Sequence, residues 1–177
     1  MRIGILIIST LMMVSGAGCT TTQSASETSR QAGDNDMSPK KRVIILCTGN
    51  SCRSQMAEAF WRQYGDGKWE VVSAGTHPSG RVYPLAIQAM AEKSIDISKQ
   101  QSKSIDPFLN QHFDLVITVC SDADENCPHF PNGGKYLHRG FDDPPKAPGS
   151  EEDRMRVTRR VRDEIDMQVR EWINANS

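Results

Sequence analysis

Residues 42–54 read RVIILCTGNSCRS, and this stretch carries the clearest structural signal in the chain. Its first half, 42–47 (RVIILC), is an unbroken run of mostly β-branched and aliphatic residues. Such a run is typical of a strand that is covered on both faces, as in a parallel α/β sheet. A polar turn with Gly and Asn follows, and apolar residues at helical spacing begin near Gln55. A strand, a tight loop and a helix in this order predict the start of a βαβ unit.

The same alternation continues along the chain. Further strands are predicted at 69–74, 114–120 and 135–138, and helices at 55–64, 83–93 and 106–111. A last helix begins at Ser150, which forms a capping-box pattern with Asp153 and precedes apolar residues at helical intervals up to Trp172. Strands that alternate with helices form right-handed crossovers. We therefore expect an α/β fold, a single domain with a doubly wound, four-stranded parallel sheet flanked by helices.

Length and composition exclude several classes of protein. The chain has 177 residues, five cysteines and a formal charge of −1. A nucleic-acid binder normally has a basic excess, so we expect no nucleic-acid partner. Five unevenly spread cysteines do not make a disulfide-stapled mini-scaffold, and a domain of about 140 residues buries a core without such staples.

The first forty residues have the composition of a targeting segment. A basic start and an apolar run are followed by the small residues 15–18 (SGAG) and then by Cys19. This order resembles a bacterial lipoprotein signal, in which Cys19 becomes the lipidated first residue. We expect a lipoprotein-type signal at 1–19, a disordered polar tether at 20–41 and the folded domain at 42–177.

This organisation predicts a membrane-anchored lipoprotein that faces the periplasm or the exterior. The alternative is a translation start at Met37, because MSPKKRVIILC is a natural opening for a cytosolic domain. In that case the protein is cytoplasmic. The compartment matters for the cysteines, since exported compartments are often oxidising and would trap thiols as a disulfide.

The loop at 47–54 has the properties of an anion-binding site. Gly49 and Asn50 tolerate positive φ, so successive N–H groups can turn inward, and the N-terminus of the following helix adds its positive end. Arg53 can hold a tetrahedral oxyanion with two parallel hydrogen bonds. The anion is expected to contact Thr48, Gly49, Asn50, Ser51, Cys52, Arg53 and Ser54.

Cys47 lies at the base of this loop and is the candidate nucleophile. A free thiol with a pKa of about 8.5 is only about 3% ionised at pH 7, and the field of the loop favours the thiolate. The alternative is a buried structural cysteine beside a surface arginine. The position of the motif between a predicted strand and a predicted helix favours the catalytic interpretation.

Two more cysteines lie at the end of the third predicted strand and shortly after it. Cys120 ends that strand, and Cys127 follows seven residues later on a polar, acidic segment. The C-terminal ends of parallel strands open on the same edge of a sheet, so Cys120 can approach Cys47. A zinc site that includes His129 and His138 is an alternative, although the two cysteines are further apart than zinc ligands usually are. Two inert buried cysteines are another alternative.

The segment CTGNSCRSQMAE (47–58) closely resembles the active-site loop of the low-molecular-weight protein tyrosine phosphatase family, in its thioredoxin-coupled arsenate reductase branch. The resemblance extends over residues 43–172 or so. Phosphatases of this family usually have Pro after the Arg-Ser pair, where this chain has Gln55. The resemblance implies an arsenate reductase. A protein tyrosine phosphatase and a lipid-tethered oxyanion-binding protein without turnover are the alternatives.

The resemblance also implies a three-cysteine relay that detoxifies arsenic. Cys47 attacks arsenate, and Cys120 then attacks the Cys47 sulfur and releases arsenite. Cys127 takes over the disulfide, which thioredoxin reduces. Cys52 is expected to be structural.

Residues 140–144 (GFDDP) resemble the general-acid loop of the family. Asp143, with Asp142 as the second choice, is therefore expected to protonate the departing oxygen. An Asp-Pro turn without chemistry is the alternative.

Some relatives bind a potassium ion behind the loop. Asn50, Glu58 and Ser73 match that site, but Lys103 stands where the second acidic ligand is expected. We expect the Lys103 ammonium near Glu58, and we predict no bound metal and no cofactor. The expected partners are arsenate and thioredoxin, and the chain is expected to be a monomer.

Overall fold

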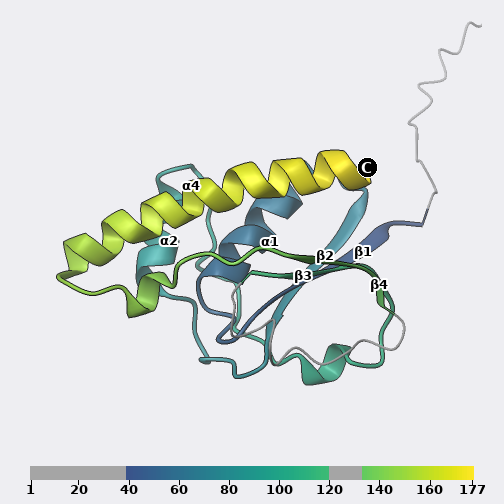
Figure 1. The fold of residues 1–177 in the computed structure, drawn as a ribbon, viewed down its shortest axis with the longest axis horizontal. Coiled ribbons are helices and arrows are strands. Elements are labelled where there is room, and N and C mark those ends of the chain that lie inside the picture. The colour runs from purple at the N-terminus through teal and green to yellow at the C-terminus, as the bar shows by residue number, and fades with distance from the viewer. Residues whose placement is uncertain (1–38, 120–132) are drawn as a thin grey trace, which may run out of the picture. The chain divides into compact units, whose positions relative to one another are not determined.

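The computed structural model describes residues 39–119 and 133–177, and the statements below refer to these residues. Their centre is a four-stranded parallel sheet with the strand order β2-β1-β3-β4 (Figure 1). The strands are β1 (Lys41–Cys47), β2 (Trp69–Gly75), β3 (Phe113–Thr118) and β4 (Gly133–His138). The predicted sheet is confirmed, with small shifts at the strand ends. The expected end of the third strand, Cys120, lies outside the described residues.

β1 is buried on both faces, as its aliphatic sequence predicts. Side chains alternate between the two faces of a strand. Val43 and Ile45 pack with the helices, whereas Ile44 and Leu46 pack on the opposite face in a second cluster that includes Ile105. All four strand residues are at most 1% exposed. The central position of β1 fixes the place from which the loop at 47–54 leaves the sheet.

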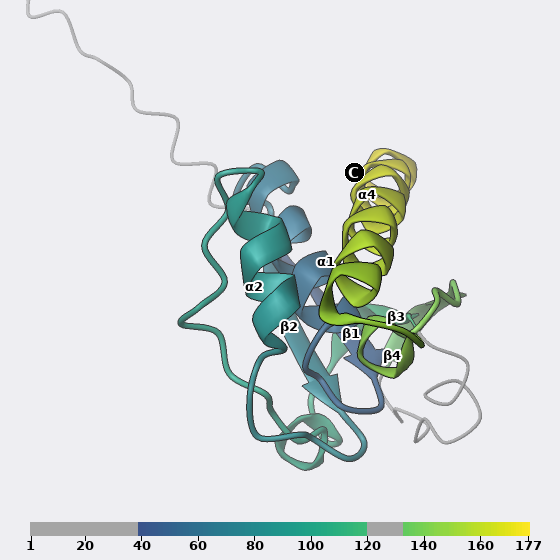
Figure 2. The same cartoon turned by 90° about the vertical axis from the view of Figure 1, so that its left-hand side faces the viewer.

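Helices α1 (Arg53–Tyr64), α2 (Pro84–Ala91) and α4 (Glu151–Asn176) lie on one face of the sheet (Figures 1 and 2). The second cluster covers the other face and is closed by residues around η1 (Asp106–Phe108). The helix expected at 106–111 is therefore a single 3₁₀ turn. Its short form follows from i→i+3 hydrogen bonds, such as the one from the Phe108 N–H to the Ile105 carbonyl at 2.9 Å.

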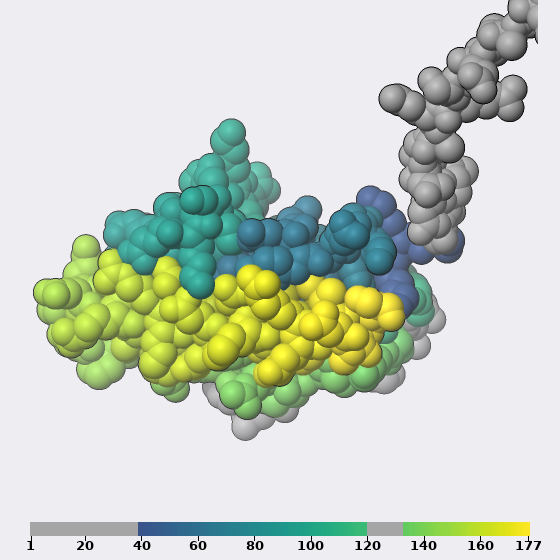
Figure 3. Space-filling view, turned by 90° about the horizontal axis from the view of Figure 1, so that it is seen from above, coloured from purple at the N-terminus to yellow at the C-terminus, as the bar shows by residue number. Residues whose placement is uncertain are grey.

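The predicted capping box at the start of α4 is confirmed. The Asp153 N–H donates to Ser150 Oγ at 3.1 Å, and the Ser150 N–H donates to Asp153 Oδ2 at 2.8 Å. Such a cap contributes about 1 kcal/mol to helix stability. The apolar face of α4 is buried along its length, and α4 extends along the surface beside α1 and α2 (Figure 3). None of the described helices has the length and apolar character of a membrane span.

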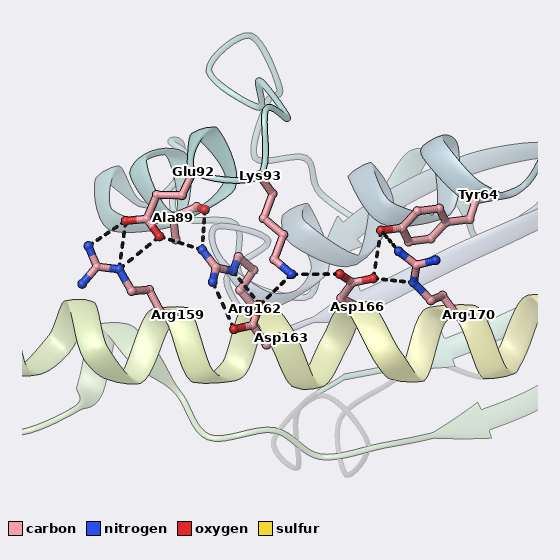
Figure 4. Close-up of polar contacts among 9 residues, drawn as sticks. All are labelled: Tyr64, Ala89, Glu92, Lys93, Arg159, Arg162, Asp163, Asp166 and Arg170. Atoms are coloured by element: carbon pink, nitrogen blue, oxygen red, sulfur yellow. Dashed lines mark hydrogen bonds and ion pairs between the residues drawn. The ribbon is translucent and has the colours of Figure 1, made fainter.

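Polar contacts, most of them between charged side chains, connect α4 to α1 and α2 (Figure 4). We call this set the α4 network, and it consists of Tyr64, Ala89, Glu92, Lys93, Arg159, Arg162, Asp163, Asp166 and Arg170. The buried Arg162 guanidinium donates to the Ala89 carbonyl and to the Glu92 carboxylate, both at 2.8 Å. Asp166 accepts hydrogen bonds from Tyr64 Oη at 2.9 Å and from Arg170 Nε at 2.9 Å. The network thus fixes how α4 lies across the other two helices.

Candidate active site

Residues 47–54 join β1 to α1, and we call them the anion loop. Three of its carbonyl groups point outward and accept hydrogen bonds of 2.8–2.9 Å from the segment after β2. The acceptors are Thr48, Gly49 and Ser51, and the donors are the N–H groups of His77, Ser79 and Tyr83. A trans peptide carries its N–H opposite its C=O. The N–H groups of residues 49, 50 and 52 therefore point to the inside of the loop.

Asn50 holds the loop in this shape. Of the two residues expected to tolerate positive φ, Asn50 adopts it, with φ of 42°, and Gly49 does not. The Asn50 side chain is fully buried and donates to Ser54 Oγ at 2.9 Å and to Ser73 Oγ at 2.8 Å. Its Oδ1 accepts the N–H of Lys103 at 2.7 Å. This one side chain therefore joins the anion loop to β2 and to the segment before η1.

The Cys47 sulfur lies at the base of the anion loop and is surrounded by polar groups. It is 2.9 Å from Ser54 Oγ, and the Asn50 N–H donates to it at 3.2 Å. Because Ser54 Oγ already accepts a hydrogen bond from Asn50 Nδ2, its own hydrogen can be donated to the sulfur. Hydrogen bonds to the charged form favour a thiolate. Cys52 differs, because burial raises the pKa of its thiol and keeps it protonated.

Arg53 closes the loop and is itself buried. Its side chain is 9% exposed; one terminal nitrogen donates to the Phe141 carbonyl at 3.1 Å, and the other is 2.9 Å from Asp143 Oδ1. Its Nε has no hydrogen-bond partner among the described residues. An unmade hydrogen bond at a buried donor costs about 1–3 kcal/mol. A ligand oxygen that accepts from Nε would recover this cost.

The structure distinguishes between the two candidate acids. Asp143 lines a pocket of about 200 Å³ together with the anion loop. Asp142 is exposed and forms an ion pair with Arg160 on α4 at 2.6 Å. The pocket is lined by Cys47, Thr48, Gly49, Ser51, Cys52, Arg53, Asp143, Pro145 and Lys146. Only Asp143 of the pair is therefore placed to reach a bound oxyanion.

The expected ammonium beside Glu58 is present. Lys103 Nζ is 3.4 Å from Glu58 Oε2, and this oxygen also accepts the Ser73 hydroxyl. Arg62 pairs with the other Glu58 oxygen at 2.7 Å. Across residues 39–119 and 133–177, no group of three or more His, Cys, Asp or Glu side chains is arranged to hold a metal ion. The buried Glu58 charge is thus balanced by protein cations.

Three predicted sulfur positions, Cys19, Cys120 and Cys127, lie outside the described residues, as does His129. The described end of β3 lies beside the end of β1. Thr118 is in register with Leu46, and the Val119 N–H donates to the Leu46 carbonyl at 2.9 Å.

Sequence reasoning missed two residues that shape the site. Gly75 ends β2 where the anion loop passes closest, and a Cβ there would lie 2.6 Å from the Thr48 carbonyl oxygen. Gln55 is fully buried, and its Nε2 donates to the carbonyls of Asn50 and Gln101, both at 2.9 Å. A polar residue in the first turn of a helix was the available signal for Gln55. Nothing local marked Gly75, because its neighbour comes from another segment.

Comparisons with known proteins agree with this geometry. The family described as "Low molecular weight phosphotyrosine protein phosphatase" matches residues 42–176. An arsenate reductase of Halalkalibacterium halodurans is 50% identical over 131 residues, which cover 74% of this chain and 94% of that protein.

The chain also resembles solved structures of arsenate reductases. "An arsenate reductase in the phosphate binding state" is 35% identical, with a TM-score of 0.67, and the match covers 77% of this chain and 99% of that one. A thioredoxin-dependent arsenate reductase of Corynebacterium glutamicum is 28% identical, with a TM-score of 0.58. That match covers 77% of this chain and 61% of the Corynebacterium chain.

Proposed function

The chain belongs to the low-molecular-weight phosphotyrosine protein phosphatase family, and we propose that it is an arsenate reductase that uses thioredoxin as its reductant. The observation that carries the proposal is the 50% identity to an arsenate reductase across nearly the whole of that protein. The anion loop supports it, because inward N–H groups and a buried guanidinium surround a sulfur. The thioredoxin partner rests on the likeness to the Corynebacterium protein.

The first step joins arsenate to Cys47. The oxyanion enters the pocket and accepts hydrogen bonds from the inward N–H groups and from Arg53. The Cys47 thiolate attacks arsenic, a sulfur–arsenic bond forms, and one oxygen leaves. Asp143 delivers a proton so that this oxygen departs as water.

The second step reduces arsenic. The Cys120 thiolate attacks the Cys47 sulfur, so a disulfide forms while the sulfur–arsenic bond breaks. Its electron pair stays on arsenic, which leaves as arsenite. The Cys127 thiolate then attacks Cys120 and releases the Cys47 thiolate. Two electrons from the thioredoxin dithiol finally reduce the Cys120–Cys127 disulfide, and the net products are arsenite, water and oxidised thioredoxin.

Substitution of Cys120 tests the function. In Cys120→Ser, arsenite production with thioredoxin should be lost, while any side hydrolysis of p-nitrophenyl phosphate should remain, because that reaction uses only Cys47, Arg53 and Asp143. The matched control is Cys19→Ser, which changes a cysteine that belongs neither to the proposed relay nor to the anion loop. A wild-type protein that hydrolyses the aryl ester briskly and makes no arsenite would instead be a phosphatase.

We also propose that Cys19 carries the lipid of a membrane anchor and that the residues between Cys19 and β1 form the tether. The order of apolar run, small residues and cysteine supports this organisation. Mass analysis of the native N-terminus tests it, because a diacylated Cys19 differs greatly in mass from a chain that begins near Met37. The second result would place the enzyme in the cytoplasm. We also propose that the protein is a monomer, and light scattering on the same sample tests this.

A further inference from the structure

A second cation lies at the mouth of the pocket. Residues 140–146, which we call the acid loop, end in η2 (Pro144–Lys146), and Lys146 lines the pocket. Its side chain is 73% exposed, whereas that of Arg53 is 9% exposed. The pocket is therefore lined by one buried and one exposed cation.

Asp143 lies between these two cations. Its Oδ1 is 2.9 Å from Arg53, and its Oδ2 is 3.6 Å from Lys146 Nζ. An oxyanion that takes the Arg53 hydrogen bonds therefore lies beside Asp143 and near the Lys146 ammonium. The ammonium attracts a doubly charged anion. Lys146 is thus placed to favour entry of the anion into the pocket.

The entrance of the pocket also affects which group can depart from a bound substrate. The group that departs from a bound substrate must lie next to Asp143, which protonates it, and therefore next to Lys146. For an inorganic oxyanion the departing group is a hydroxyl, which can accept a hydrogen bond from the ammonium. For an aryl ester it is an apolar ring, which displaces water from the ammonium without replacing those hydrogen bonds.

We infer that Lys146 is a specificity-determining residue that selects compact inorganic oxyanions over bulky phosphate esters. This inference rests on the proposed function of the same pocket and names the feature that separates its two substrate classes. Charges at a rim act mainly on capture and on salt dependence. The effect is therefore expected in KM more than in kcat.

The test compares three variants with the wild type. Lys146→Gln removes the charge, Lys146→Arg keeps it, and Lys68→Gln removes an exposed lysine just before β2, at the other end of the strands. The probes are arsenate with thioredoxin, inorganic phosphate binding by calorimetry, and p-nitrophenyl phosphate hydrolysis. Each is measured at low and at high salt.

Loss of the Lys146 charge near the bound anion should raise the KM for arsenate and the Kd for phosphate about three- to tenfold in Lys146→Gln. The kcat should stay within about twofold, the salt dependence should weaken, and kcat/KM for the aryl ester should fall less than for arsenate. Lys146→Arg and Lys68→Gln should resemble the wild type. Equal losses for both substrates, or an unchanged KM, would overturn the inference.

The outcomes also separate this inference from the proposed function. If the wild type makes no arsenite but phosphate binding still weakens in Lys146→Gln, the reductase assignment fails and the anion-capture role of Lys146 stands. If Lys146→Gln makes arsenite with the kcat and KM of the wild type, the reductase assignment stands and the role of Lys146 fails.

Discussion

The anion loop and the α4 network both contain buried charged side chains, Arg53 in the first and Arg162 and Asp166 in the second, but they use them differently. In the α4 network, charged side chains meet opposite charges or carbonyls, and no buried side-chain atom of the network is left without a partner among the described residues. At the anion loop, the buried Arg53 Nε has no such partner, and Arg53 lines an open pocket. A saturated network stabilises a fold, whereas an unpartnered buried donor that lines a pocket favours a bound acceptor.

This comparison predicts that changes in the two regions have separable effects. Substitution in the anion loop should remove activity at nearly unchanged stability. Substitution in the α4 network should lower stability at nearly unchanged activity, because the network lies on helix surfaces and does not line the pocket.

The largest effect is expected for Arg53→Lys. Lysine keeps the charge but loses the planar fork and the buried Nε, so two parallel hydrogen bonds to an oxyanion become impossible. We expect kcat/KM for arsenate to fall about 10²- to 10³-fold, as for the loss of a transition-state donor. The measurement is arsenite formation, with the melting temperature as control. Activity within tenfold of the wild type would contradict the assigned role.

The next effect is expected for Asp166→Asn in the α4 network. The amide cannot accept all the hydrogen bonds that Tyr64, Lys93 and Arg170 donate to the carboxylate. We expect a loss of about 2 kcal/mol in the free energy of unfolding, seen as a lower urea midpoint, with kcat retained.

Glu164→Gln is the matched control on the same helix. Glu164 pairs with Arg160 on the helix surface, and such exposed pairs contribute less than about 1 kcal/mol. If Glu164→Gln destabilised the protein as much as Asp166→Asn, burial would not be the reason for the strength of the network.

Acid should weaken the α4 network. Hydrogen bonds from Arg162 lower the pKa of Asp163. Burial alone would raise the pKa of Asp166, but the hydrogen bonds from Arg170, Tyr64 and Lys93 outweigh burial and lower this pKa. A carboxylate whose pKa is lower when folded adds stability above its unfolded pKa, and this stability is lost as the pH falls through the folded pKa.

The free energy of unfolding should therefore decrease as the pH is lowered below about 5, where carboxylates begin to bind protons in the unfolded chain. The decrease should be smaller in Asp166→Asn, which lacks one of these carboxylates. Urea midpoints across this pH range provide the measurement, and an identical pH dependence in both proteins would show that Asp166 does not contribute.

The smallest effect is expected for Arg160→Ala, because Arg160 belongs to neither region and connects α4 to the loop that carries Asp143. Arg160 pairs with Asp142, the neighbour of Asp143, and so ties the acid loop to α4. Both side chains are at least half exposed, so the pair is weak. We expect a two- to threefold fall in kcat/KM, about 0.5 kcal/mol, with an unchanged melting temperature. A tenfold fall would mean that this pair controls the position of Asp143.

Much of the fold followed from local patterns. The aliphatic run at 42–47 predicted a doubly covered strand, and the Ser150 and Asp153 pair predicted the start of α4. These signals were readable because an aliphatic run and a capping pair are patterns of residues close in sequence. The helix expected at 106–111 was too long, since its length depends on how the segment closes over the sheet.

The sequence by itself determined the chemistry that is available, namely a sulfur followed by a glycine-containing loop and an arginine, with two further cysteines later in the chain. Only the tertiary structure decided how the loop is used. It turned the loop carbonyls outward onto residues 77–83, left Arg53 Nε buried without a hydrogen-bond partner among the described residues, and placed Asp143 rather than Asp142 at the pocket. The physical reason is that the types of side chain are encoded locally, whereas burial, direction and charge compensation arise only when distant segments pack together.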